Sequence, residues 1–124
     1  MKITHPLVSV VDDDESVRES LPDLIREFGF SVKAFSSAEE FLASDSVGKT
    51  RALILDVAMP GMSGPELQRE LARRGQSIPT VFITAHRDET VRPRLIGQGA
   101  VECLFKPFSD AALQDALSAA LAAD

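Results

Sequence analysis

The sequence predicts an α/β fold in which a doubly wound, five-stranded parallel sheet is flanked by five helices. Two observations predict this fold. Short runs of β-branched and apolar residues alternate with segments of helical periodicity, and the connections between them are short. Such alternation indicates strand-helix-strand units with right-handed crossovers, whose strands run parallel. The 124 residues are enough for one domain, because two domains of half that length would each lack a sufficient core.

The predicted strands share their β-branched and apolar composition and cover residues 7–11, 31–35, 52–57, 80–84 and 101–105. The segments at 52–57 and 80–84 are almost continuously apolar. This pattern is typical of strands that are covered on both faces, as the inner strands of a parallel sheet are.

The first helix is indicated by apolar residues at helical spacing from Val17 to Phe28. Asp14 precedes it and is assigned as its N-cap, which leaves this carboxylate outside the candidate functional site. Gly29 follows as the residue that ends the helix.

Two capping boxes predict the starts of the next helices. Ser36 with Glu39 precedes the second helix, and Ser63 with Glu66 precedes the third. The third helix is expected to end near Gly75.

The fourth helix, around residues 90–98, is the weakest of the five. Pro93 disfavours helical geometry at Arg92, and Gly97 and Gly99 lose more backbone entropy than other residues when fixed in a helix. This helix should therefore be short, frayed or displaced. The fifth helix begins after Ser109 as its N-cap and presents one apolar stripe. The stripe consists of Leu113, Leu117, Ala120 and Leu121.

Composition excludes several classes of function. The formal charge of −6, without a basic cluster, argues against direct nucleic-acid binding. No apolar run approaches the roughly 20 residues of a membrane span, and no secretory signal is visible. Cys103 is the only cysteine, which indicates a reducing, cytoplasmic setting and rules out an intrachain disulfide. With only His5 and His86 beside it, a structural Cys/His zinc site is excluded as well.

Polar residues follow the predicted strands at their carboxyl ends, where open α/β sheets bind their ligands. Asp12 and Asp13 follow the first strand, while Asp56, Thr84 and Lys106 end or follow the third, fourth and fifth. Grouped carboxylates repel one another unless a cation joins them, and a set of oxygen ligands suits Mg²⁺. Lys106 adds a charge suited to an anionic group. The pattern suggests phosphoryl chemistry on a carboxylate.

Each residue also has a simpler interpretation. Asp56 taken alone is a plausible turn residue, Thr84 a strand residue, and Lys106 a solvated strand end. His86 alone is a loop residue. The joint placement of these residues at strand ends favours a functional site.

Four motifs along the chain carry a family resemblance. They are VVDDDESVR at 10–18, LILDVAMPGMSG at 53–64, VFITA at 81–85, and GA followed by KPF within 99–108. In this order and spacing the chain resembles a receiver domain of a two-component response regulator. It is most similar to receivers that precede a helix-turn-helix output domain in bacterial transcriptional regulators.

The resemblance implies a flavodoxin-like strand order of 2-1-3-4-5 and a phosphorylation-controlled signalling switch. Asp56 would accept a phosphoryl group from a histidine kinase or a phosphotransfer protein. Asp13 would bind Mg²⁺ directly and Asp12 partly through water, with Asp56 and the Ala58 carbonyl completing the ligands.

The remaining family roles fall on residues of the fourth and fifth strands. Thr84 would donate its hydroxyl to the phosphoryl group, and Lys106 would offset the charge of the phosphoryl oxygens. The resemblance also implies a cis Lys106-Pro107 bond. A homodimer surface would involve the fourth helix, fifth strand and fifth helix.

The chain departs from the family pattern at positions that modulate the site. Cys103 stands where the family usually has Tyr or Phe, and it is interpreted as a small strand residue or, alternatively, as an oxidisable thiol. Ala58 offers no side chain to cover the site, and Ala85 and His86 follow Thr84 at its entrance. We expect His86 to reach across that entrance.

Three alternative functions remain open at this point. They are an Mg²⁺-dependent phosphatase or phosphotransferase with Asp56 as nucleophile, a receiver-like interaction module that is not phosphorylated, and a flavodoxin-like nucleotide binder. The first lacks a further acid/base carboxylate beside Asp56, and the last lacks a phosphate-binding loop. All of residues 1–124 belong to the expected receiver, which is either a stand-alone protein or part of a longer regulator.

Overall fold

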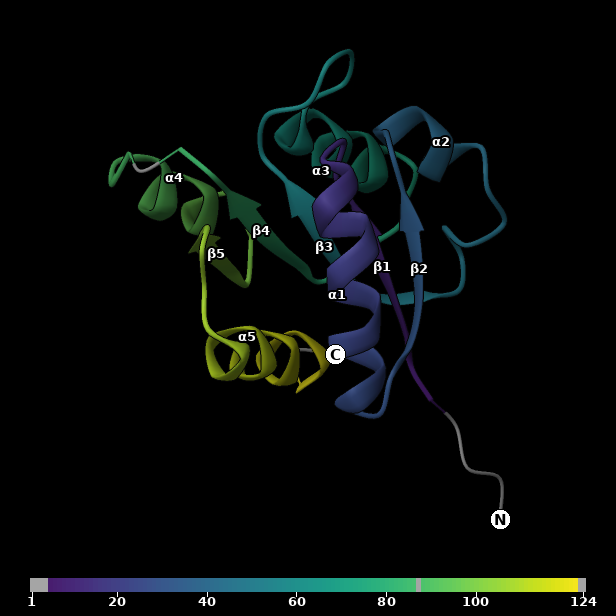
Figure 1. The fold of residues 1–124 in the computed structure, drawn as a ribbon. Coiled ribbons are helices and arrows are strands. Elements are labelled where there is room, and N and C mark those ends of the chain that lie inside the picture. The colour runs from purple at the N-terminus through teal and green to yellow at the C-terminus, as the bar shows by residue number, and fades with distance from the viewer. Residues whose placement is uncertain (1–4, 87, 123–124) are drawn as a thin grey trace.

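The computed structural model describes residues 5–86 and 88–122 as a parallel sheet covered by helices on both faces (Figure 1). The five strands are β1 Leu7–Val11, β2 Ser31–Phe35, β3 Thr50–Asp56, β4 Thr80–Thr84 and β5 Glu102–Phe105. The five helices are α1 Glu15–Glu27, α2 Ala38–Leu42, α3 Gly64–Arg73, α4 Val91–Gly97 and α5 Asp110–Ala122. The strand order is β2-β1-β3-β4-β5, which confirms the expected flavodoxin-like topology.

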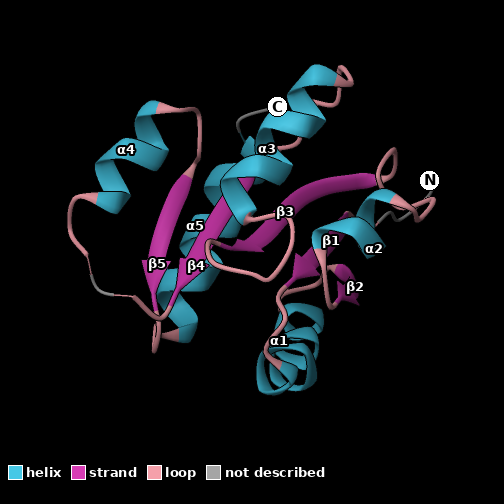
Figure 2. Cartoon of the chain, turned by 90° about the horizontal axis from the view of Figure 1, so that it is seen from above, coloured by secondary structure: helices cyan, strands magenta, loops and turns pink. Residues whose placement is uncertain are grey.

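The core has two layers, one on each face of the sheet. Helices cover both faces (Figure 2). Ile54 of β3 lies with Ile25 in the layer under α1 and α5. Leu55, the next residue, lies with Phe41 and Leu71 in the layer under α2, α3 and α4. Neighbouring side chains of a strand point to opposite faces, so β3 is buried on both sides, as its apolar sequence predicts.

Strands β1, β2 and β4 have the predicted bounds, whereas β3 and β5 differ from prediction. Strand β3 begins at Thr50, two residues earlier than expected, because this polar residue pairs with Leu7 and its hydroxyl bonds to that of Ser9 at 2.6 Å. It ends at Asp56, after which the chain turns towards α3. Strand β5 begins one residue later than expected, at Glu102.

The predicted start and end of α1 are confirmed. The Asp14 side chain accepts a hydrogen bond from the Ser16 amide at 2.9 Å, as an N-cap does. Gly29 follows the helix with a φ of +98°, a conformation that favours glycine.

The capping box predicted for α2 from Ser36 and Glu39 does not form, and the helix is capped one residue later. Ser37, not Ser36, is the N-cap, and its Oγ accepts from the Glu40 amide at 3.0 Å. Glu40 in turn accepts from the Ser36 amide at 2.8 Å. Both registers match the capping pattern, and packing selects the one that buries Ala38 and Phe41. Glu39 is left outside the cap.

The other helix ends agree with the sequence. The Ser63 and Glu66 capping box of α3 is present, and Ser109 caps α5 by accepting from the Ala112 amide at 3.0 Å. Helix α4 has only seven residues. Pro93 is tolerated because it lies in the first turn, where backbone amides have no partner within the helix. The expected short fourth helix is therefore confirmed.

Within the described residues, no helix combines the length and the apolar character that crossing a bilayer requires.

Candidate functional site

The carboxyl ends of β1, β3, β4 and β5 enclose a cleft of about 320 Å³. All strands of the sheet point to this edge (Figure 1). The residues that line the cleft are Asp13, Asp14, Asp56, Ala58, Thr84, Ala85, His86 and Lys106. Seven of these eight were predicted from the sequence as site residues, and the eighth, Asp14, was assigned to the helix cap.

Three carboxylates form the acidic side of the cleft. Ligand oxygens of Asp12, Asp13 and Asp56 all lie within 4.8 Å of one another. Asp12 is fully buried, Asp56 is 7% exposed, and Asp13 is exposed to solvent. Two buried carboxylates and an accessible one thus share a small volume.

Asp12 is fixed on three sides. Its Oδ2 accepts a hydrogen bond from Lys106 Nζ at 2.9 Å, and its Oδ1 accepts from the Asp14 amide at 2.9 Å. Arg18 Nη1 donates to the backbone carbonyl of Asp12 at 2.9 Å. Arg18 lies within the motif at 10–18, but no role was predicted for it, because this bond depends on how a long side chain turns after folding. The result is a rigid carboxyl end of β1.

The electrostatics of the site are dominated by Asp56. Burial, and then the charge of Asp12, raise the pKa of Asp56 to about 7, although Lys106 partly offsets them. Burial would lower the pKa of Lys106, but its bond to Asp12 and the charge of Asp56 outweigh burial and raise that pKa. Without a cation, the cleft therefore disfavours an ionised Asp56.

The donor set fits a divalent cation. It consists of carboxylate oxygens with one member open to solvent, and Mg²⁺ prefers such oxygens while keeping several waters. A cation beside Asp56 would also favour its ionised form, which burial disfavours.

Thr84 and His86 form the opposite side of the cleft. Thr84 is buried, and its Oγ1 accepts a hydrogen bond from the His86 amide at 3.0 Å. This bond uses an oxygen lone pair and leaves the hydroxyl proton for donation to a group in the cleft. The His86 side chain is exposed at the entrance, beside Ala85. The Lys106-Pro107 bond is cis, which confirms the expectation from the resemblance.

Cys103 lies outside the cleft, in β5, with a side chain only 1% exposed. Burial, and then the charge of Glu102, raise the pKa of its thiol. The interpretation as a small core residue agrees with this position. A buried thiol with a raised pKa forms little reactive thiolate, so the structure argues against the redox interpretation.

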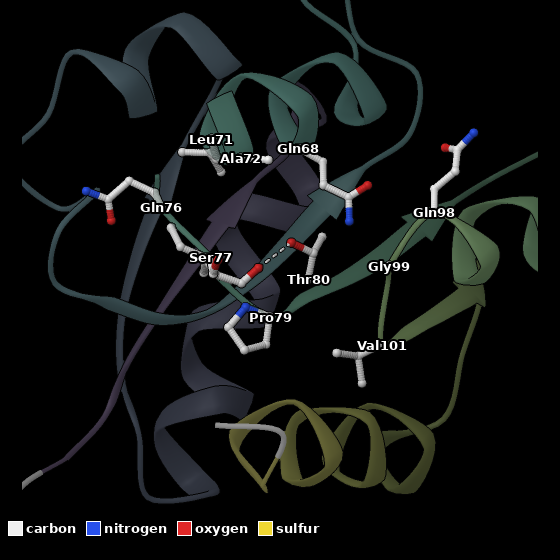
Figure 3. A pocket seen from close by; sticks show the side chains of 11 residues that line it. Gln68, Leu71, Ala72, Gln76, Ser77, Pro79, Thr80, Gln98, Gly99 and Val101 are labelled. Atoms are coloured by element: carbon white, nitrogen blue, oxygen red, sulfur yellow. Dashed lines mark hydrogen bonds between the residues drawn. The ribbon is translucent and has the colours of Figure 1, made fainter. Parts of the chain in front are cut away.

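A second hollow, of about 470 Å³, lies at the opposite edge of the sheet, where β4 begins (Figure 3). Its wall includes the side chains of Gln68, Gln76, Pro79 and Val101. None of its lining residues carries a charge. This hollow offers no group for acid-base, metal or phosphoryl chemistry, in contrast to the cleft.

The family model for the response regulator receiver domain matches residues 8–118. The chain belongs to this family. As a receiver domain, it has a place in phosphorylation-controlled two-component signalling, and none of the comparisons favours the alternative functions.

Related sequences agree with this assignment. Nodulation protein W of Bradyrhizobium diazoefficiens is 47% identical over 121 residues, which are 98% of this chain and 53% of that protein. The transcriptional regulatory protein FixJ of Rhizobium meliloti is 39% identical over 118 residues, covering 95% of this chain and 58% of that protein. The receiver domain thus spans about half the length of the curated relatives it matches, several of which are transcriptional regulators.

Solved structures agree as well. The response regulator StyR superposes with a TM-score of 0.87 at 47% identity, over 97% of this chain and 61% of that one. The FixJ-N crystal structure superposes with a TM-score of 0.84 at 38% identity, over 98% of this chain and 96% of that one.

Proposed function

We propose that this receiver domain accepts a phosphoryl group on Asp56 from the phosphohistidine of a histidine kinase or a phosphotransfer protein. The observation that carries the proposal is the meeting of three carboxylates, Lys106 and Thr84 at one cleft. An Asp56 oxygen forms the new P–O bond while the P–N bond to the donor histidine breaks, and the electron pair of that bond returns to the imidazole.

Asp12, Asp13, Asp56 and the carbonyl of Ala58 would hold Mg²⁺. The bound cation would supply positive charge against the oxygens of the phosphoryl group. Exposed Asp13 offers a direct ligand, whereas buried Asp12, engaged by Lys106, suits a ligand that acts through water.

Lys106 and Thr84 would stabilise the phosphorylated state. Lys106 donates a hydrogen bond to Asp12, and the negative charge of Asp56 also stabilises its ammonium group. This ammonium group can also donate to a phosphoryl oxygen. Thr84 would donate its free hydroxyl proton to another of these oxygens. Because Thr84 Oγ1 also holds the His86 amide, its movement would carry the loop after β4 with it.

The proposed output is a change of partner surface and not a chemical product. Movement of the loop after β4 would shift α4, which follows this loop. The shift of α4 would in turn change a homodimer surface made of α4, β5 and α5. We place the domain in the cytoplasm, where its kinase partner would present the phosphohistidine. The net charge of −6 argues against nucleic-acid binding by this domain itself.

Intact mass spectrometry after incubation with a small-molecule phosphodonor and Mg²⁺ tests the proposal. We expect a mass gain of one phosphoryl group in the wild-type protein and none in the Asp56→Asn variant. Replacing Mg²⁺ with a chelator should slow the gain strongly. A gain that survives Asp56→Asn would place the chemistry elsewhere, and analytical ultracentrifugation of the same samples would report dimerisation.

A further inference from the structure

Glu39 of α2 reaches the loop between β3 and α3, which directly follows the proposed phosphoacceptor. Its Oε2 accepts a hydrogen bond from the Met62 amide at 3.0 Å, across 23 residues of sequence. The neighbouring Glu40 has a different task, since it binds the Ser36 amide at the start of its own helix. Two adjacent glutamates thus serve different parts of the molecule.

Glu39 also lies close to Gly61 of the same loop. Gly61 has a φ of +75°, and a Cβ added there would lie 2.8 Å from Glu39 Oε2. The carboxylate therefore occupies the space that a side chain at position 61 would need. Gly61 allows both the turn of the backbone and the close approach of Glu39.

The loop contains the Ala58 carbonyl, one of the proposed Mg²⁺ ligands. Backbone hydrogen bonds hold its two ends. The Val57 amide donates to the Ile83 carbonyl at 3.1 Å, and the Gly64 amide donates to the Val57 carbonyl at 3.0 Å. Glu39 holds the loop from a separate element, at Gly61 and Met62 near its α3 end. Met59 of the loop and Phe41 of α2 belong to the same core layer, so the loop and α2 share apolar packing.

We propose that Glu39 is a positioning residue, which fixes the β3–α3 loop and thereby the place of the Ala58 carbonyl at the metal site. This inference rests on the proposed function, because it assigns that carbonyl to Mg²⁺. A simpler role for Glu39 is a favourable charge in the first turn of α2. The two roles differ in what they require: positioning needs a hydrogen-bond acceptor, whereas the helix end needs a negative charge.

Three variants separate these roles. Glu39→Ala removes both the acceptor and the charge, while Glu39→Gln keeps an acceptor of the same size and removes the charge. Glu40→Ala is the matched control. It removes a carboxylate from the same helical turn, but this carboxylate binds the Ser36 amide and not the loop. Circular dichroism and thermal melting establish that each variant is folded.

Two measurements are made on each protein by nuclear magnetic resonance: hydrogen exchange of the Met62 amide without metal, and amide shifts during titration with MgCl₂ alone. For Glu39→Ala, we expect Met62 to exchange about three- to tenfold faster and the Kd for Mg²⁺ to rise by a similar factor, as the loss of one hydrogen bond implies. Glu40→Ala should remain within about twofold of wild type in both measurements. Glu39→Gln should fall between wild type and Glu39→Ala, because a neutral acceptor forms a weaker hydrogen bond than a carboxylate does.

The inference is overturned if Glu39→Gln behaves like Glu39→Ala, or if Glu40→Ala weakens Mg²⁺ binding as much as Glu39→Ala does. It is also overturned if Met62 exchange and the Kd stay unchanged in Glu39→Ala while the wild-type protein is phosphorylated on Asp56, in which case the proposed function stands. If the wild-type protein neither binds Mg²⁺ nor gains a phosphoryl group, the proposed function fails and the inference falls with it.

Discussion

The Asp56 carboxyl group is 7% exposed and lies beside buried Asp12, which together raise its pKa to about 7. The unfolded chain releases this proton near the ordinary value of 3.8, whereas the folded chain holds it to about pH 7. The contribution of Asp56 to the free energy of unfolding of the metal-free protein should therefore fall as the pH rises from about 4 to about 7. The geometry suited to phosphoryl transfer is thus a source of instability when no cation is bound.

Asp56→Asn should remove this pH dependence. The amide resembles the protonated acid in shape and carries no charge, so at pH 8 the variant should be more stable than wild type by roughly 2–4 kcal/mol. The difference should shrink as the pH falls towards 4. Urea unfolding in the presence of a chelator measures it, and an equal stability of the two proteins at pH 8 would contradict the electrostatic account.

Ala58→Arg should lengthen the lifetime of phosphorylated Asp56. Ala58 lines the cleft without covering it, so a long side chain there would restrict the approach of water to the phosphoryl group. Ala72→Arg adds the same side chain at an exposed position of α3, outside the cleft, and serves as the control. Decay of the phosphorylated species, followed by intact mass, should slow only for Ala58→Arg; the same decay rate in both variants would refute this role.

The strand-end residues could be predicted because the rule for parallel sheets needs only the strand positions, as with Asp56 at the end of β3 and Thr84 at the end of β4. Arg18 and Glu39 could not, since their roles depend on where a long side chain turns after folding. Glu39 was instead assigned to a capping box with Ser36, whereas the helix is capped by Ser37.

Helix α4 has little local support from its own residues. It has seven residues, its N-cap residue Thr90 makes no capping bond with its side chain, and Leu95 is its one buried residue. Its weakness was predictable from Pro93 and Gly97, whereas the cap register of α2 was not, because two adjacent serines and two adjacent glutamates allow both registers. Local patterns identify an element, and packing against the sheet decides its register.

Gly97→Ala should stabilise α4. A Cβ added at Gly97 meets nothing within 4 Å, and alanine favours the helix, so we expect a gain of about 0.5–1 kcal/mol in the free energy of unfolding. Gly99 provides the contrast, because its space is also open but its φ of +106° strains any other residue. Urea unfolding of both variants checks this prediction, which fails if Gly97→Ala is destabilising or if Gly99→Ala is equally stabilising.

On the scale of the whole molecule, the sheet brings residues from opposite ends of the chain to one edge. Lys106 and Asp12 are 94 residues apart in sequence and form an ion pair of 2.9 Å. This pair and the cleft around it exist only when β1, β3, β4 and β5 are assembled. Ligand binding at the cleft should therefore be coupled to global stability.

Mg²⁺ should raise the melting temperature of the wild-type protein. A ligand that binds only the folded state stabilises it by about 2.7 kcal/mol at one hundred times its Kd. Asp13→Asn removes the exposed carboxylate that we propose as a ligand and should abolish most of the shift, while its metal-free stability stays close to wild type. Thermal melting followed by circular dichroism measures both; an equal shift in wild type and Asp13→Asn would exclude Asp13 from the metal site.

The most direct test of the central claim is to locate the phosphorylated residue. After reaction with a phosphodonor and Mg²⁺, reduction with borohydride converts a phosphorylated aspartate into homoserine, which peptide mass spectrometry locates. We predict a single modified position, Asp56, in the peptide that follows Arg51. Modification at Asp12 or Asp13 in place of Asp56, or at no aspartate, would contradict the account.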